Sequence, residues 1–107
     1  MEFEFEWDED KRGDLLRQRG IDILDAARMF NRPEAMEIWP DPRDHEGERR
    51  YNAIGPVEEV YYELVFAWRD DRVRLITAWK LNDKSRQKAQ ARYARRTQRD
   101  EKARRDR

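Results

Sequence analysis

The pattern of apolar and polar positions begins with a strand. Residues 3–7 alternate aromatic with acidic side chains, and this period of two predicts a short strand with one buried face. Two helical signals follow it. Asp8 can cap a helix over about residues 9–19, and Asp22 begins a second helix near residues 23–31.

Beyond the helices the period returns to two. The segment 36–40 alternates apolar and charged residues, and prolines at its end confine it to a sheet edge. Further strands are predicted at residues 48–55, 61–68 and 73–79. These segments either alternate apolar with polar residues or are rich in aromatic and β-branched residues. The charged residues 69–72 predict a hairpin turn between the last two. These segments favour three or four strands in meander order.

The last segment contains few apolar residues. Asn82 can cap a helix in which Ala89, Tyr93 and a few other alanines are the apolar positions, so we expect a solvated helix that frays toward Arg107. The sequence thus predicts a body over residues 1–81 and a basic helix or tail over residues 82–107. The expected fold class is α+β, with two N-terminal helices packed on a small antiparallel β-meander.

The zero net charge of the chain conceals two oppositely charged parts. Residues 1–79 contain 12 Lys and Arg against 20 Asp and Glu, whereas residues 80–107 contain 12 against 4. A basic segment of this density can hold an RNA backbone, can lie on an acidic partner or on its own acidic body, or can simply be solvated. The sequence leaves these three alternatives open.

Composition excludes several classes of protein. At 107 residues the chain is long enough for one small domain with a thin core. It contains no cysteine and one histidine, so disulfides and thiolate metal sites are excluded, a zinc cluster is disfavoured, and no cofactor is implied. Neither a signal peptide nor a long apolar segment is recognised, and we therefore expect a soluble cytoplasmic protein with no membrane contact.

Five short blocks of sequence carry a more specific signal. They are Phe5-Glu6-Trp7-Asp8 with Lys11, then Gly20, then Asp25-Ala26-Ala27 with Phe30, then Glu48-Arg49-Arg50-Tyr51 with Ile54-Gly55, and Arg74-Leu75-Ile76-Thr77-Ala78. In their order and spacing, over about residues 3–93, the chain resembles the BrnT family. Members of that family are ribonuclease toxins of type II toxin-antitoxin systems with a RelE-like fold.

The resemblance implies a metal-independent endoribonuclease that cleaves RNA and inhibits translation and growth. It also implies a cognate ribbon-helix-helix antitoxin, which binds the toxin and carries the contact with operator DNA. A homodimer within that complex is a further expectation. Carried over by position, the acidic and basic pair of the family falls on Glu48 and Arg50, and the arginine of its last strand falls on Arg74.

The chain departs from the family pattern at three places. Gln18-Arg19-Gly20 stands where the family usually has Lys-His-Gly, Phe66 stands in place of a tyrosine, and Trp79 in place of an arginine. Two proton carriers and one cation are therefore missing. These departures favour an alternative in which the chain is a catalytically decayed partner of the antitoxin and a co-repressor. A nucleic-acid-binding protein driven by the tail is a third alternative.

Metal-free RNA cleavage requires a base near the 2′-hydroxyl and cations around the phosphate. We assign Glu48 or His45 as the base, and Arg50 with Arg74 as the phosphate clamp, because guanidinium groups meet phosphate bidentately. Tyr51 or Tyr61 is a candidate for base stacking or proton donation. Further RNA contacts are expected from Lys11, Lys80 and Arg86.

Each candidate also has an ordinary structural explanation. Glu48 and Arg50 lie two apart on a strand, so they share a face and can form a solvated ion pair. Arg74 can merely cover a sheet edge, His45 can be an exposed turn residue, and Lys11 can pair with the acidic residues beside it.

Overall fold

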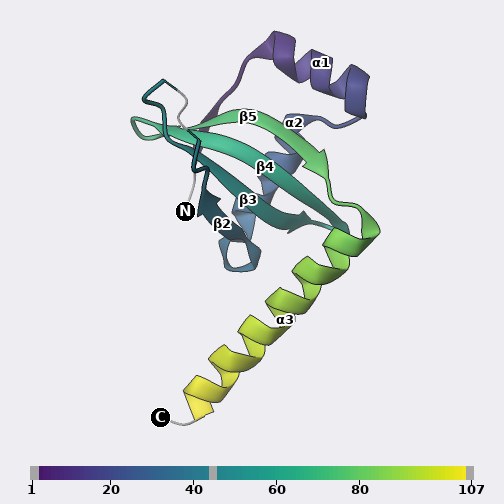
Figure 1. The fold of residues 1–107 in the computed structure, drawn as a ribbon, viewed down its shortest axis with the longest axis vertical. Coiled ribbons are helices and arrows are strands. Elements are labelled where there is room, and N and C mark those ends of the chain that lie inside the picture. The colour runs from purple at the N-terminus through teal and green to yellow at the C-terminus, as the bar shows by residue number, and fades with distance from the viewer. Residues whose placement is uncertain (1–2, 44–45, 106–107) are drawn as a thin grey trace.

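The computed structural model describes residues 3–43 and 46–105 and has an α+β fold (Figure 1). Along the chain, the secondary-structure elements are β1 (Glu4–Glu6), α1 (Glu9–Arg19), α2 (Ile23–Ala27), the 3-10 helices η1 (Arg28–Asn31) and η2 (Pro33–Ala35), β2 (Glu37–Pro40), β3 (Arg50–Val57), β4 (Val60–Arg69), β5 (Arg72–Lys80) and α3 (Asp83–Arg105). The predicted α+β class is confirmed.

The five strands form one mixed sheet in the order β1-β5-β4-β3-β2. Strands β2 to β5 form the expected antiparallel meander, but β1 pairs in parallel with β5. The expectation of a purely antiparallel sheet was therefore wrong. Phe5 pairs with Val73 in this arrangement. The parallel pairing thus gives the apolar face of β1 a place beside the core.

Helix boundaries follow local capping. The Asp8 carboxylate accepts hydrogen bonds from the backbone N–H groups of Asp10 and Lys11, and Gly20 ends α1 at a positive φ of 67°. The Asp22 carboxylate caps α2 at the N–H of Leu24. The second predicted helix is present, but only Ile23–Ala27 is α-helical and its last turn is the 3-10 helix η1.

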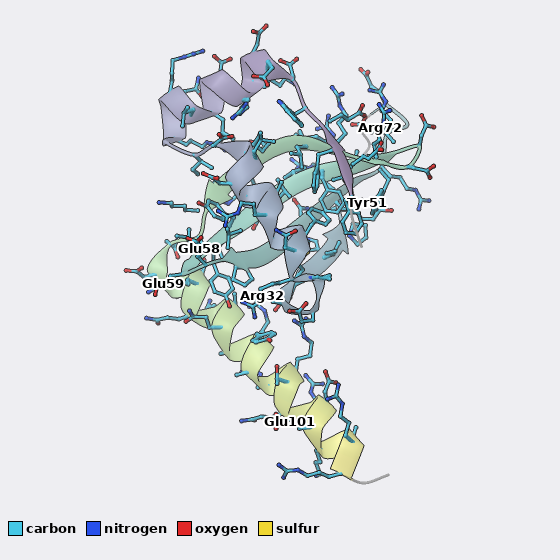
Figure 2. All side chains as sticks on the ribbon, turned by 180° about the vertical axis from the view of Figure 1, so that it is seen from behind. Arg32, Tyr51, Glu58, Glu59, Arg72 and Glu101 are labelled. Carbon is cyan, nitrogen blue, oxygen red and sulfur yellow. The ribbon has the colours of Figure 1, made fainter. Side chains whose placement is uncertain are left out.

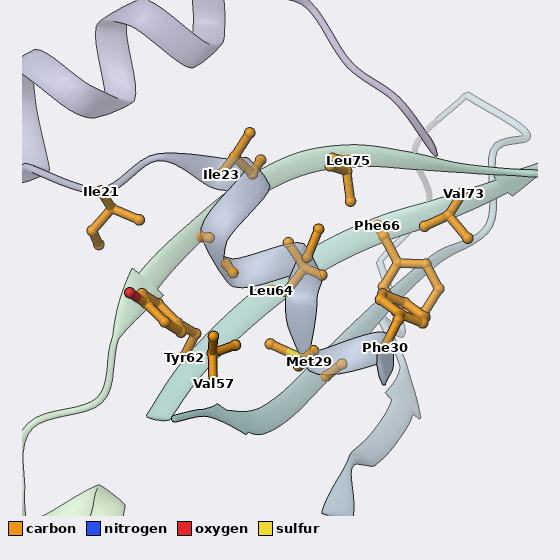
Figure 3. Packing of buried hydrophobic residues seen from close by; sticks show 14 of the residues in the cluster. Ile21, Ile23, Met29, Phe30, Val57, Tyr62, Leu64, Phe66, Val73 and Leu75 are labelled. Carbon is orange, nitrogen blue, oxygen red and sulfur yellow. The ribbon is translucent and has the colours of Figure 1, made fainter. Parts of the chain in front are cut away.

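The hydrophobic core lies on one face of the sheet only. Helix α2 and η1 cover this face, as the view from behind shows (Figure 2). Phe66 and Leu64 of β4 are 1% and 0% exposed and belong to the same buried cluster as Met29 and Phe30 of η1 (Figure 3). Phe30 packs edge-on against Phe66, with ring centroids 5.3 Å apart. A short chain with 45% charged residues thus concentrates its apolar side chains in a single layer.

Strand β3 continues through a glycine and a proline. The strand was expected to end at Gly55-Pro56, yet Pro56 pairs with Tyr61 within the sheet. Strand β2 pairs with β3 only as far as Ile54, so the outer edge of β3 has no partner strand at Pro56 and the missing N–H costs no ladder bond. Gly55 is required for packing, since a Cβ there would lie 3.1 Å from the Cβ of Met29.

Strand β5 contains a β-bulge. Phe66 pairs with Leu75, whereas Val65 pairs with Thr77, so one extra residue of β5 is accommodated between them. The bulge reverses the alternation of side chains along β5. As a result, Arg74 on one side of the bulge and Thr77 on the other point to the same face of the sheet.

Helix α3 begins beyond the end of the sheet, and its C-terminal part projects away from the body (Figure 1). Asn82 caps it as predicted, accepting a hydrogen bond of 2.8 Å from the N–H of Ser85. It is helical to Arg105, and the expected fraying toward Arg107 falls on residues 106–107, outside the described residues. No helix in the described part of the chain combines the length and the apolar character needed to cross a bilayer.

The side chain of Arg12 joins α1 to the N-terminus of α2. Arg12 donates two hydrogen bonds to the Asp22 carboxylate, at 2.9 and 2.8 Å, in addition to the cap that Asp22 forms. These bonds, and above all those from Arg12, lower the pKa of Asp22. The ionised carboxylate therefore stabilises the fold above about pH 4, and this contribution is lost as the pH falls below that range.

We expect Asp22→Asn, which retains a capping oxygen, to lower the free energy of unfolding at pH 7 by less than Asp22→Ala does, and the two variants should differ by about 1 kcal/mol. The deficit of Asp22→Asn relative to the wild type should narrow at pH 3. Urea unfolding at both pH values measures these differences. A deficit of equal size at pH 3 would show that the charge of Asp22 does not stabilise the fold.

Candidate functional site

The face of the sheet opposite α2 and η1 is not covered by a second layer, and we call it the open face. Figure 1 shows this face toward the viewer, with α2 behind the strands. Val65 and Ala67 are buried, yet neither belongs to the core cluster, because both lie on the open face between neighbouring strands. Asn52 and Thr77 pair with Val65 from the two sides and lie on the same face.

Two arginines occupy one row across the open face. Ala67 of β4 pairs with Arg50 of β3 on one side and with Arg74 of β5 on the other, and Arg74 in turn pairs with Glu6 of β1. Paired residues project to the same face of a sheet. Arg50 and Arg74 therefore rise from the same face two strands apart, at a Cα separation of about 10 Å. Only a small side chain, Ala67, lies between them.

Carboxylates flank this row at both ends. The Arg50 Nε donates to Glu48 Oε1 at 3.1 Å, and both side chains are about 30% exposed. At the other end Glu6 Oε1 lies 4.0 Å from Arg69 Nη1 and is buried without a hydrogen bond. Among the described residues, Arg74 has neither an ion pair nor a hydrogen bond through its side chain. The guanidinium group of Arg74 is thus available to an anionic ligand.

This arrangement has the elements of an anion-binding site with a base beside it. Two guanidinium groups on one face can contact the oxygens of one phosphate from both sides, since arginine side chains are long and flexible. The Glu48 carboxylate, held by Arg50, is positioned to accept a proton from a group bound next to that phosphate. In the described part of the chain, no three His, Asp or Glu side chains are grouped as metal ligands.

Sequence reasoning missed Glu6 and Arg69. Glu6 belongs to the acidic side of the alternating segment 3–7, so its polar environment was foreseeable. Its position beside Arg74 was not, because that depends on the parallel pairing of β1 with β5.

Several candidates from the sequence lie apart from this row. Tyr51 projects to the opposite, helix-covered face, where its ring stacks on Phe66 at 5.6 Å (Figure 2). Lys80 pairs with the core residue Tyr62, which again puts it opposite the open face. Arg86 lies in the first turns of α3, beyond the far end of the sheet, 3.5 Å from Asp83.

The remaining candidates are more widely distributed. Lys11 is exposed in the first turn of α1. Tyr61 lies on the open face near α3, at the end away from Arg50, and burial raises its pKa. His45 falls outside the described residues. The structure therefore brings Arg50 and Arg74 to one face with Glu48 beside Arg50, and it places Lys11, Tyr51, Tyr61, Lys80 and Arg86 apart from them.

The departures at positions 19, 66 and 79 have different structural settings. Arg19, at the end of α1, donates to the hydroxyl of Thr77 at 3.2 Å and to the carbonyl of Ala78 at 2.9 Å. Its guanidinium lies 5.8 Å from the ring centroid of Trp79. A cation thus reaches the edge of β5 beside Trp79, although it comes from a different element. Phe66, by contrast, is part of the core.

A comparison with models of protein families matches most of the chain. Residues 7–85 match the model of a family described as the ribonuclease toxin, BrnT, of type II toxin-antitoxin systems. The chain belongs to this family, and membership implies an antitoxin as partner. A comparison with curated proteins gave no match for the chain.

Helix α3 is held on the body as far as Arg96, whereas its last turns are not. Arg92 Nε donates to both oxygens of Glu37, at 2.8 and 2.9 Å. Arg96 donates to the carbonyl oxygens of Met36 and Glu34, at 3.3 and 2.8 Å. The body thus engages two cations of the tail directly. From position 98 to Arg105 every residue is exposed.

Removal of residues 98–107 should leave the fold intact and weaken RNA binding. The truncated chain should retain its melting temperature, because Arg92 and Arg96 remain. If the outer cations contact RNA, the dependence of log affinity on log salt should become shallower by about 0.7 for each lost phosphate contact. Titration of single-stranded RNA at several salt concentrations measures the slope. An unchanged slope would exclude a role of the outer helix in holding RNA.

Proposed function

We propose that the chain is a metal-independent endoribonuclease whose cleavage of RNA inhibits translation and growth. The observation that carries the proposal is the pair of arginines, Arg50 and Arg74, on one face of the sheet, with Glu48 bound to one of them and Arg74 available to a ligand. Membership of a ribonuclease toxin family supports the same conclusion.

In the proposed reaction, the Glu48 carboxylate takes the proton of a ribose 2′-hydroxyl. The 2′-oxygen attacks the adjacent phosphorus, a new O2′–P bond forms, and the bond from phosphorus to the 5′-oxygen breaks. Arg50 and Arg74 stabilise the charge that develops on the non-bridging oxygens. The leaving 5′-oxygen takes a proton from water, to which the open face is accessible. His45 remains an alternative base, and Lys11, Tyr51, Lys80 and Arg86 remain candidate contacts for more distant parts of the RNA.

We further propose that a ribbon-helix-helix antitoxin neutralises the protein in the cytoplasm, and that the fold arrangement is RelE-like. Operator DNA is then contacted through the antitoxin alone, since the body itself carries excess negative charge. A homodimer within the complex remains part of this proposal.

The second candidate is a decayed toxin that serves as antitoxin partner and co-repressor. The observation that favours it is the replacement of candidate proton carriers by Arg19 and Phe66, of which the second is sealed in the core. Such a protein would still bind its antitoxin but would leave RNA intact.

The double variant Arg50→Ala, Arg74→Ala should lose both toxicity and RNA cleavage, with a fall in rate of at least a hundredfold, because charge stabilisation at the phosphate is removed from both sides. Arg17→Ala with Arg28→Ala is the matched control, since these exposed arginines lie on α1 and η1, away from the open face, and the substitution removes the same charge. Growth after induction and mapping of RNA ends are the readouts.

Circular dichroism must show that both double variants fold. The proposal is wrong if the Arg50/Arg74 variant cleaves RNA as fast as the wild type. Normal growth and intact RNA with the wild-type chain in the absence of antitoxin would instead favour the decayed toxin.

A further inference from the structure

One carboxylate on the open face has no role in the fold or in the proposed reaction. Glu63, near the middle of β4, is half-buried, and among the described residues it has no hydrogen-bond or ion-pair partner. Its cross-strand neighbours are Ile54 and Trp79, which are both apolar. Burial raises its pKa. Such a group reduces stability, so a ligand that completes its hydrogen bonds would explain its presence.

The surface around Glu63 suits a planar ligand. Trp79 lies beside it on β5, partly buried, where it also contacts the core cluster at the edge of the sheet, and Trp39 of β2 is paired with Asn52 of the same face and is 37% exposed. The side chains between these two tryptophans are small or apolar, namely Val65, Asn52 and Ile54. An open sheet face with spaced aromatic side chains is a common platform for unstacked bases of single-stranded RNA.

The surface around Glu63 lies on the same face of the sheet as Arg50 and Arg74, but at a distance from them. Glu63 precedes Ala67 by four residues on β4, which corresponds to about 13 Å along the strand. Glu63 is therefore too far from the phosphate between Arg50 and Arg74 to take part in its chemistry. One short single strand of RNA can nevertheless occupy both places.

The hydrogen bonds that a carboxylate can accept indicate which RNA nucleobase fits beside Glu63. An ionised carboxylate only accepts hydrogen bonds, so its two oxygens require two adjacent donors. Guanine offers them on its Watson–Crick edge, at N1–H and the exocyclic amine. Adenine and cytosine have one donor beside a ring acceptor, and uracil has one donor between two carbonyl groups.

We propose that Glu63, with Trp79 beside it, forms a guanine-binding subsite for a nucleotide near the cleaved phosphate. This inference rests on the proposed action on RNA and adds a base preference to it. The carboxylate accepts both donors of the guanine edge, and the indole ring of Trp79 supports the base by stacking.

Binding of short 2′-O-methyl oligonucleotides tests the subsite without cleavage. Three uridine-rich strands that differ in one central base, guanine, inosine or adenine, are titrated against the full chain by fluorescence anisotropy. Guanine should bind about tenfold more tightly than adenine, as expected for one bidentate contact. Inosine lacks the exocyclic amine and should fall between them. This comparison requires no mutation.

The protein side is tested with Glu63→Gln and its matched control Glu59→Gln. Glu59 is exposed in the turn between β3 and β4, so the control makes the same change of charge off the subsite. Glu63→Gln should abolish the preference for guanine, whereas Glu59→Gln should retain it. Equal binding of guanine and adenine by the wild type, or no binding of any strand, overturns the inference. So does a preference that survives in Glu63→Gln.

Two further outcomes separate the subsite from its alternatives. If Glu63→Gln weakens only the complex with the antitoxin, Glu63 serves a basic side chain of that protein and the inference is wrong. The binding assay does not depend on cleavage. If the chain prefers guanine in this assay but leaves RNA intact in a cleavage assay, the proposed ribonuclease is contradicted and the guanine subsite is still supported. If the chain cleaves RNA but binds guanine and adenine equally well, the proposed ribonuclease is supported and the guanine subsite is contradicted.

Discussion

Packing of α2 and η1 against one face of the sheet is the contact on which the other features depend. Phe66, Leu64 and Met29 are almost completely buried in this layer, and Gly55 lets Met29 approach β3 closely. Because the chain has few apolar residues, it covers one face of its sheet and leaves the other to solvent. The uncovered face carries the two arginines of the candidate catalytic group, and Glu48 is paired with one of them. One-sided burial is thus the condition for a binding surface on so small a protein.

Electrostatics act on two scales in this molecule. Residues 1–79 carry an excess of eight acidic residues, and this field repels a phosphate backbone at long range. On the open face the local balance differs, because Arg50 and Arg74 stand in one row with Ala67 between them. The body also holds two cations of the tail, through Glu37 and through the carbonyl groups of Glu34 and Met36. Part of the basic tail therefore neutralises the body, and its outer turns remain exposed.

Local signals in the sequence predicted the elements well. The caps at Asp8, Asp22 and Asn82 and the alternation in 3–7 depend on neighbouring residues only, and the structure confirms the elements that they predicted. The family blocks pointed to Glu48, Arg50 and Arg74. The register brings the two arginines to one face, and an ion pair holds Glu48 beside Arg50.

What the sequence could not predict depends on contacts between distant segments. The parallel pairing of β1 with β5 joins residues about 70 positions apart, and it brings Glu6 to Arg74. The bulge in β5 determines that Trp79 faces Glu63, although simple alternation from Arg74 would turn it away. Pro56 is accommodated in β3 only because β2 stops short of it.

The pairing of β1 with β5 also imposes an order on synthesis. Strand β1 is made first, but its partner residues 72–74 follow only after α1, α2 and the other three strands. A growing chain therefore cannot complete the row from Glu6 to Arg50 until two thirds of it has emerged from the ribosome. Closure of such a non-local pairing is slow compared with formation of the meander. The nascent protein is thus assembled with the row of Arg74 and Arg50 incomplete, which leaves an interval in which a partner made nearby can meet the chain before its open face is formed.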